Sequence, residues 1–439
     1  MKLTGWGRYP VVDCRWLSAR YPDEAVHLVQ THDSLIARGN GRAYGDAALN
    51  RLGTLSMMGF NRVLDFDAAS RRITCEAGML LSDLLAFTLP RGFFVPVSPG
   101  TQYVTLGGMF AADVHGKNHH KQGSFGDFVE SARLLLANGG TVACSTTNLG
   151  ELFAATRGGM GLTGVILDLT FRLLPVESRY VRQETVRARE LAQVMDLFEE
   201  SADVTYTVAW IDCFARGRSA GRSILYRGEH ANVTELPPQL RATPLQVHSP
   251  RRLRMPFDFP TFLLNKYTIG AFNTLYYLAG RPSIGIVDFE SFFYPLDAIL
   301  EWNRIYGRPG FVQYQCVMPK RTSYQGISRL LDRISSAGKG SFLAVLKLFG
   351  HQSGLLSFPM EGYTLALDFP ADAATFRLLN ELDDIVSDHG GRIYLAKDAR
   401  MKPGMLAAGY PGLAAFRDVR ARHDPGHKFN SCLSERLEL

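Results

Sequence analysis

The stretch Arg38-Gly39-Asn40-Gly41-Arg42-Ala43-Tyr44-Gly45-Asp46 directly follows Leu35-Ile36-Ala37, which is typical of a short strand. Glycine permits positive φ and close approach of the main chain to a ligand, so that successive amides can point at phosphate oxygens. The spacing differs from the Rossmann fingerprint, because the third glycine comes one residue late and Tyr44-Gly45-Asp46 is a poor start for a helix. The stretch predicts a phosphate-binding loop, or a merely structural one, in a fold other than the Rossmann fold.

Two further glycine clusters occur in the first 175 residues. Pro99-Gly100-Thr101 precedes Thr105-Leu106-Gly107-Gly108, where Thr105 is a candidate N-cap of a short helix. Arg157-Gly158-Gly159-Met160-Gly161-Leu162-Thr163-Gly164 comes directly before a predicted strand. Three such loops in one domain are hard to explain as turns alone. Together they favour a long dinucleotide wrapped by backbone amides.

Three histidines stand close together in His115-Gly116-Lys117-Asn118-His119-His120-Lys121. No Asp, Glu or Cys set at ligand spacing accompanies them, and the two lysines would repel a cation, so we expect no metal. A basic loop beside an anionic or electron-rich cofactor is our interpretation, with a solvated surface loop as the alternative. A metal-dependent hydrolase built on His115, His119 and His120 stays a further alternative, which predicts loss of activity on chelation.

The composition is that of an ordinary globular protein, with 439 residues of which 46% are hydrophobic and 21% charged. A net charge of +6 is far from the signature of a nucleic-acid binder. The start of the chain lacks an apolar signal core, and no stretch approaches the roughly 18–20 apolar residues of a membrane span, so we expect a cytoplasmic protein. The six cysteines are scattered, which predicts reduced, buried thiols.

Short strands and helices are mixed without a clean βαβ repeat, which predicts an α+β protein of two closely packed domains. We expect hairpins at residues 62–77 and 129–145, and a helix at 82–89 with Ser82 as its N-cap. Further strands are expected at 35–37, 165–173, 206–214, 311–318, 342–348 and 363–369, and a further helix at 188–200.

The motifs at residues 37–47, 99–108, 115–120 and 161–165 resemble the FAD-binding domain of the vanillyl-alcohol oxidase and p-cresol methylhydroxylase (PCMH) superfamily. More closely, the chain resembles the decaprenylphosphoryl-β-D-ribose 2-oxidase family over nearly its whole length. The further matching segments occur in the same order and are Leu3-Thr4-Gly5-Trp6-Gly7-Arg8, Asn265-Lys266-Tyr267-Thr268, Glu301-Trp302-Asn303-Arg304, Gln313-Tyr314-Gln315, Lys347-Leu348-Phe349-Gly350, Ala396-Lys397-Asp398 and Arg436-Leu437-Glu438-Leu439.

The resemblance implies a PCMH-type FAD-binding domain at residues 1–177 and an inserted substrate-binding domain with an antiparallel sheet at 178–392. Residues 393–439 would return to the FAD domain. It also implies oxidation of the 2'-hydroxyl of a polyprenyl-phosphoryl ribofuranose, or a similar lipid-linked sugar, to a keto sugar. A separate short-chain dehydrogenase/reductase would complete the net epimerisation to the arabinose form.

Carried over residue by residue, the resemblance implies both cofactor-binding and substrate-binding positions. The cofactor-binding residues would be Ala37, Arg38, Gly39, Asn40, Gly41, Arg42, Ala43, Tyr44, Gly45, Asp46, Ala47, Gly100, Thr105, Leu106, Gly107, Gly108, Ala112, Asp113, Val114, His115, Val165, Tyr394 and Lys397. The substrate side would hold Trp210, Gln315, Lys347 and Ala366.

Lys397, His115 and Tyr44 are the candidate catalytic residues. We expect the carbinol hydrogen to leave as hydride to flavin N5, with Lys397 near the flavin N1/C2 edge and the substrate hydroxyl. A partly desolvated lysine there can have a lowered pKa suited to proton exchange. The alternative pairs Lys397 with Asp398 or another acid, and His115 is at least as well suited to bond the cofactor as to move a proton.

Two departures from the family pattern bear on cofactor and substrate. Arg42 stands where covalent members of the superfamily have histidine, so we expect non-covalent FAD. Ala366 replaces the cysteine that covalent inhibitors of the family attack, and Thr364 and Phe293 also differ from the pattern, which leaves the identity of the sugar or lipid open. A soluble aldonolactone or alditol oxidase and a non-enzymatic flavin-binding protein are the alternatives.

Residues 249–281 combine three arginines with many aromatic residues and leucines. This composition suits a loop that touches anionic lipid at the inner membrane and guides a prenyl chain. An ordinary buried helix with a charged lead-in is an equal alternative. Lys266, in this stretch, and Lys347 with Gln315 are candidates to meet a phosphate-sugar.

Overall fold

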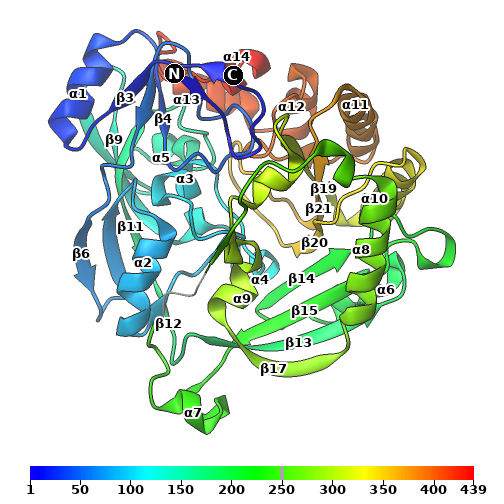
Figure 1. The fold of residues 1–439 in the computed structure, drawn as a ribbon. Coiled ribbons are helices and arrows are strands. Elements are labelled where there is room, and N and C mark those ends of the chain that lie inside the picture. The colour runs from blue at the N-terminus through cyan, green and yellow to red at the C-terminus, as the bar shows by residue number, and fades with distance from the viewer. Residues whose placement is uncertain (248–251) are drawn as a thin grey trace.

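The computed structural model describes residues 1–247 and 252–439, and Figure 1 shows two halves side by side, each built on its own sheet. In the N-terminal half, five antiparallel strands have the order β10-β9-β11-β7-β6. They are β6 (Val63–Asp67), β7 (Arg72–Glu76), β9 (Val129–Leu135), β10 (Thr141–Ser145) and β11 (Val165–Arg172). A parallel sheet of β3 (Trp16–Ser18), β5 (Thr54–Ser56) and β4 (Ile36–Arg38) lies in the same half. Both predicted hairpins are confirmed, because β6 pairs with β7 and β9 with β10.

The α-helices of this half are short, with four to ten residues each. They are α1 (Pro22–Thr31), α2 (Leu81–Thr88), α3 (Leu106–Ala111), α4 (His119–Gln122) and α5 (Gly150–Thr156). Thr105 caps α3 as predicted, since its side chain accepts a hydrogen bond from the Gly108 amide at 3.3 Å. The predicted cap of α2 is wrong: the Leu81 and Ser82 amides donate to the carbonyls of Val104 and Gln102, so the helix begins one residue earlier.

The second half is built on an eight-stranded sheet in the order β17-β13-β15-β14-β20-β21-β19-β22, with antiparallel neighbours throughout. The strands are β13 (Tyr180–Ala188), β14 (Tyr206–Ile211), β15 (Ser223–His230), β17 (Ser283–Asp288), β19 (Phe311–Pro319), β20 (Ala344–Phe349), β21 (Gly362–Pro370) and β22 (Arg392–Ile393). The helices α6 (Leu191–Glu199), α10 (Lys320–Ser336) and α11 (Ala373–Asp388) pack on it. The strands and the helix predicted in this half are confirmed to within a few residues.

Side chains of this sheet alternate between two environments, as the pleat of a strand requires. On β19, Tyr314 and Cys316 are buried in the core, whereas Gln313 and Gln315 line a cavity on the other face. The helices α8 (Lys266–Ala279) and α9 (Phe289–Phe293) also contribute to this cavity. The alternation therefore places the polar side chains of Gln313 and Gln315 on the face of the sheet that lines the cavity, which we call the inner face.

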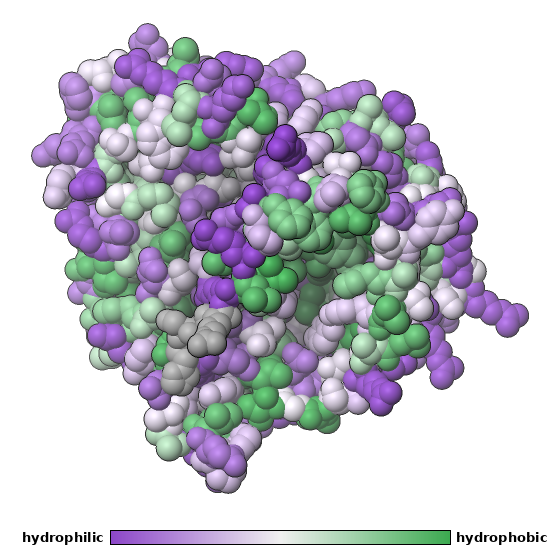
Figure 2. Space-filling view, viewed as in Figure 1, coloured by the Kyte–Doolittle hydropathy of each residue, from purple (hydrophilic) through white to green (hydrophobic). Residues whose placement is uncertain are grey.

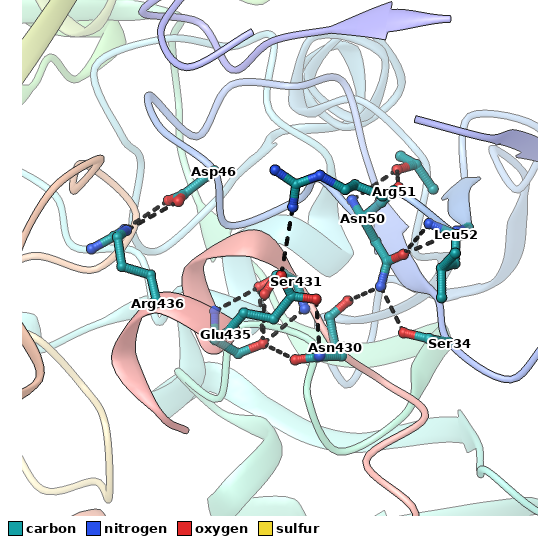
Figure 3. Close-up of polar contacts among 12 residues, drawn as sticks. Ser34, Asp46, Asn50, Arg51, Leu52, Asn430, Ser431, Glu435 and Arg436 are labelled. Atoms are coloured by element: carbon teal, nitrogen blue, oxygen red, sulfur yellow. Dashed lines mark hydrogen bonds and ion pairs between the residues drawn. The ribbon is translucent and has the colours of Figure 1, made fainter. Parts of the chain in front are cut away.

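The C-terminal tail folds back onto the N-terminal half through α12 (Pro403–Gly409), α13 (Leu413–His423) and α14 (Cys432–Leu437). Figure 3 shows Arg436 of α14 paired with Asp46, with 2.8 Å between Nη2 and Oδ1, and the side chain of Asn50 directed at the backbone of Asn430. The N- and C-termini lie close together in Figure 1. The mixed α+β architecture is confirmed; domain limits at residues 177 and 392 stay a prediction.

No helix in the described ranges is long and apolar enough to cross a membrane. Five of the six cysteines are buried, as predicted, and Cys432 is only partly buried.

Candidate active site

A cavity of about 1070 Å³ lies between the glycine loops of the N-terminal half and the inner face of the eight-stranded sheet. Most of the expected cofactor-binding residues line it, and so do the four expected substrate residues Trp210, Gln315, Lys347 and Ala366. Figure 2 shows a hollow in this face of the molecule bordered by hydrophobic side chains. The three glycine-rich loops therefore do converge on one space.

At Gly39 the first and second glycine loops pack so closely that there is room for backbone only. A Cβ on Gly39 would collide with the side chain of Thr105, so the first loop touches the second at this point. Gly41 and Gly161 have φ of +64° and +80°, which favours glycine at both positions. A Cβ at Gly100, by contrast, would meet nothing within 4 Å, because this loop faces open space. Loops that expose backbone to a cavity in this way fit a dinucleotide.

Six of the expected cofactor residues do not line the cavity: Arg38, Gly45, Asp46, Leu106, Asp113 and Val165. Arg38 donates to the carbonyls of Thr4 and Ala48, and Asp113 pairs with Arg157. Leu106 and Val165 are fully buried in the core. These residues hold the loops in shape.

Arg42 lies at one end of the cavity between two aromatic rings. Its guanidinium carbon is 3.9 Å from the centroid of the Trp6 ring and 5.0 Å from that of Tyr103. Its buried Nε has no hydrogen-bond partner in the described part of the chain. Burial lowers the pKa of Arg42, and Asp297 opposes this effect. An orphaned cationic donor beside the glycine loops fits an anionic or electron-rich cofactor.

Lys397, from the tail, is partly buried beside the first loop. Its Nζ is 3.7 Å from the centroid of the Tyr44 ring, and that ring packs edge-on against Phe311. Burial lowers the pKa of Lys397 below its ordinary range, and the nearby carboxylate of Asp368 opposes this effect. Asp398 is not the partner of Lys397, because its carboxylate accepts from Arg436 at 2.8 Å.

Asp368 lies opposite Gln313 in the β19–β21 register and is fully buried. The Gln313 amide donates to one carboxylate oxygen at 2.5 Å, and the other oxygen has no partner among the described residues. Burial raises the pKa of Asp368, while the Gln313 hydrogen bond and Lys397 lower it. Asp368 is therefore a buried carboxylate whose charge raises the pKa of Lys397, without a hydrogen bond or ion pair between the two side chains in the described part of the chain.

A chain of hydrogen bonds assigns the proton of His115. The Thr364 hydroxyl donates to the carbonyl of Cys316 at 2.8 Å, so its oxygen must accept the Gln315 Nε2–H at 3.2 Å. The other Gln315 Nε2–H then points at His115 Nε2, 3.1 Å away, which must accept. The neutral His115 ring therefore carries its proton on Nδ1. Burial and the neighbouring lysines hold the pKa of His115 well below its usual range.

The remaining predicted residues form the walls of the cavity. Trp210 Nε1 donates to the carbonyl of Phe342 at 3.0 Å, and the Tyr394 hydroxyl donates to the carbonyl of Ala112 at 3.0 Å. Ala366 pairs with Gln315 on one side and Val345 on the other, so its methyl group leaves space in the middle of the sheet face.

The histidine cluster is not arranged around a common point. His119 Nε2 contacts the Gln352 amide oxygen at 3.0 Å, and His120 Nε2 contacts the Val204 carbonyl at 2.9 Å. Across residues 1–247 and 252–439, no three His, Cys, Asp or Glu side chains are grouped to hold a metal ion.

The sequence interpretation missed Lys117, Gln313 and Trp6, which line the cavity, and Asp368, which accepts a hydrogen bond from Gln313. Gln313 had a signal, because it is two residues from Gln315 on the same predicted strand and so faces the same way. Asp368 is likewise two residues beyond Ala366 on β21. Lys117 and Trp6 reach the cavity from loops, for which no such periodicity exists.

The fold and cavity define a flavoprotein of the PCMH type: residues 23–145 match the FAD binding domain family. The chain is 37% identical to the decaprenylphosphoryl-β-D-ribose oxidase of Mycolicibacterium smegmatis, over 100% of this chain and 97% of that protein. It belongs to the decaprenylphosphoryl-β-D-ribose oxidase family. FAD is its cofactor, and it is an oxidoreductase acting on a hydroxyl group.

Two other relatives show how far the similarity extends. An uncharacterised Streptomyces coelicolor protein is 37% identical over 82% of this chain and 100% of its own length. Bovine L-gulonolactone oxidase is 32% identical, over only 36% of this chain and 35% of that protein. The lactone oxidase therefore shares only about a third of the chain.

Proposed function

We propose that the protein oxidises the 2'-hydroxyl of a polyprenyl-phosphoryl ribofuranose to a keto sugar. The observation that carries this proposal is the position of Lys397, which lines the cavity beside the first glycine loop together with Gln315 and Lys347. The name of the Mycolicibacterium relative, similar over the whole chain, supports the ribose substrate. A soluble lactone oxidase is less well supported, because the bovine relative matches only 36% of the chain.

Proton transfer is the part of the reaction that this chain supplies. FAD, when bound, supplies the hydride acceptor. Lys397 takes the hydroxyl proton of the sugar, since a partly buried lysine with a lowered pKa holds its neutral form near neutral pH. The charge of Asp368 raises the pKa of Lys397 and so opposes the effect of burial. His115 does not act as the base, because its Nε2 lone pair is engaged by Gln315.

We also propose that the FAD is not covalently attached. Arginine has no nucleophilic nitrogen free for attachment, since its guanidinium stays protonated. Arg42 is moreover held between Trp6 and Tyr103 by its charge. Acid precipitation of the yellow protein should leave all flavin in the supernatant. Flavin retained in the pellet would contradict this part of the proposal.

An apolar surface beside the cavity opening is proposed to contact the membrane and guide the prenyl chain. Of the α8 residues only Ile269 and Asn273 are buried, so the ordinary buried helix is excluded. Phe262, Tyr267 and Leu275 are 73%, 75% and 68% exposed. Apolar side chains exposed to this extent suit the interface of a bilayer.

The charged groups of the same stretch contribute less to such a contact. Arg252 pairs with Glu290 at 2.8 Å, Arg254 lies 3.7 Å from Glu301, and Arg251 is outside the described residues. Lys266 is exposed and does not line the cavity, so it is not a substrate residue.

The keto sugar requires a reductase if the net result is epimerisation at C2'. We propose a short-chain dehydrogenase/reductase as the partner enzyme for this second step. Incubation of the product with such a reductase and reduced nicotinamide should yield the arabino epimer, detected by mass spectrometry after hydrolysis.

The main test is anaerobic reduction of the FAD-loaded protein by farnesylphosphoryl-β-D-ribofuranose. We expect the visible flavin band to bleach with this substrate and to persist with free ribose and with L-gulono-1,4-lactone. Bleaching by the lactone, but not by the lipid-linked sugar, would show that the protein acts as a soluble lactone oxidase. A protein that holds FAD but bleaches with neither would be a flavin-binding protein without this activity.

A further inference from the structure

Two lysines in the cavity have no part in the chemistry described so far. Lys117 follows the first histidine of the cluster; its Nζ donates to the carbonyl of Phe292 and lies 4.4 Å from the centroid of that ring. Lys347 stands on β20, with Nζ 5.8 Å from the centroid of Phe349. Both side chains line the cavity.

Neither lysine is neutralised by a carboxylate in the described part of the chain, where no ion pair involves either Nζ. The charged residues that line the cavity are Arg42, Lys117, Asp297, Lys347 and Lys397. The carboxylate of Asp297 is engaged by the Thr101 hydroxyl and the Gln102 amide, both at 2.8 Å. The cavity is therefore strongly cationic where Lys117 and Lys347 lie.

Lys117 and Lys347 are partly buried, and cations withdrawn from water without a counter-ion are costly unless a ligand provides the opposite charge. Burial lowers the pKa of Lys117 to about 7, and Lys347 adds to this by repulsion. Burial alone lowers the pKa of Lys347 to about 8. Arg42 and Lys397 flank the glycine loops that would hold FAD, so the other two lysines are left for a second anion.

We propose that Lys117 and Lys347 together bind the phosphate of the lipid-linked sugar as a phosphodiester monoanion. This inference rests on the proposed function, and it specifies which part of the cavity takes which part of the substrate. Two lysine ammonium groups offer several N–H donors to phosphate oxygens, and among the described residues the carbonyl of Phe292 accepts from one of them.

The surroundings of Lys347 fit a sugar on one side and a lipid on the other. On β21, Thr364 pairs with Lys347 and accepts the hydrogen bond of Gln315, so the sugar-reading groups are adjacent. In the other direction the cavity is lined by Val208, which pairs with Tyr226. The Tyr226 hydroxyl lies 3.0 Å from that of Tyr276 on the exposed helix α8. A prenyl chain leaving the lysines would follow this apolar path outward.

The test uses two probes that cannot be oxidised, farnesyl methyl phosphate and farnesyl methyl ether, which differ by the phosphodiester. Binding to the FAD-loaded protein is measured by calorimetry below the micelle concentration of each probe. We expect Lys117→Met and Lys347→Met each to weaken binding of the phosphate probe by about 10- to 100-fold and to leave the ether unchanged. Lys121→Met, outside the cavity, is the matched control, and Lys347→Arg should restore binding.

Three outcomes would overturn the subsite: unchanged binding of the phosphate probe in both variants, equal loss for phosphate and ether, or equal loss in the Lys121→Met control. Flavin content and the melting temperature of each variant establish that it is folded. Because the probes need no turnover, the subsite and the proposed function fail separately. If the protein binds the phosphate probe selectively but its flavin is not bleached by the lipid-linked ribose, the phosphate subsite is supported and the proposed reaction is contradicted.

Discussion

The ammonium nitrogen of Lys397 lies 3.7 Å from the centroid of the Tyr44 ring, so a residue of the C-terminal tail covers the first glycine-rich loop. Tyr44 is partly buried, and its loss of contact with water raises its pKa well above the ordinary value. Its phenol therefore stays protonated and serves as a surface on which the lysine rests. This relationship fits the proposal that Lys397 exchanges the proton and that Tyr44 supports it.

Replacement of Lys397 by Met should slow reduction of the flavin by the lipid-linked ribose by about 100-fold or more, because the proton acceptor is lost. Single-turnover stopped-flow absorbance measures this rate. Lys402→Met, an exposed lysine at the start of α12, is the control and should behave like the parent. A near-normal rate in Lys397→Met with full flavin content would remove this lysine from the mechanism.

The rate of flavin reduction should rise with pH through the titration of Lys397, because only its neutral form accepts a proton. The carboxylate of Asp368 raises the pKa of Lys397. Asp368→Asn removes this charge, so the pKa of the lysine falls and the rising limb of the pH profile should move to lower pH. A limb that stays in place, or moves to higher pH, would show that Asp368 does not act on Lys397.

Gln315 should control the protonation of His115. In Gln315→Glu a carboxylate replaces the donor that faces Nε2, so the ring should gain a proton there and its pKa should rise from its lowered value. Nitrogen NMR of the histidine-labelled protein distinguishes the two forms. Gln315→Met, which has no donor or acceptor of comparable strength, should leave the ring neutral. A cationic ring in the parent protein would contradict the assignment.

Much of the site follows from local sequence, and the rest from pairing across the sheet. The glycine loops and the Thr105 cap are local, because a turn or a cap involves residues only a few positions apart. Asp368 was missed because its partner Gln313 is 55 residues away and only the β19–β21 register brings them together. The prediction of Ser82 as an N-cap was wrong because the backbone amides of Leu81 and Ser82 bond to the loop at residues 102–104. These long-range bonds override the local preference of serine for the cap position.

The ion pairs of the C-terminal tail could not be predicted from local sequence patterns either. The neighbour Asp398 was an obvious partner for Lys397, yet its carboxylate turns to Arg436, which is 38 residues away and also binds Asp46. Adjacency in the sequence does not indicate which acid lies near a lysine in the folded chain. The resemblance to a family predicted that Lys397 belongs to the site, but only the structure shows which residues surround it.

Arg436 should be essential for docking of the tail. Its side chain bridges Asp46 and Asp398, whose side chains are only 6% and 2% exposed. Arg436→Met would leave two buried carboxylates unpaired, at a cost of about 3–5 kcal/mol in the free energy of unfolding. Urea unfolding of the FAD-loaded protein measures this change. Arg417→Met, whose exposed side chain bonds only a backbone carbonyl, is the control, and equal stability of both variants would contradict the expectation.

The exposed face of α8 should determine binding to lipid vesicles. Tyr267 and Leu275 are 75% and 68% exposed and do not line the cavity, so their replacement leaves the site itself intact. Burying each in a bilayer interface is worth about 1.5–3 kcal/mol, so Tyr267→Ser with Leu275→Ser should lower vesicle affinity by at least about tenfold. Tyr324→Ser, 52% exposed on α10, is the matched control in co-sedimentation with anionic vesicles. Equal binding of the double variant and the control, or no binding by the parent protein, would contradict the proposed membrane contact. The apolar surface would then serve only to guide the prenyl chain.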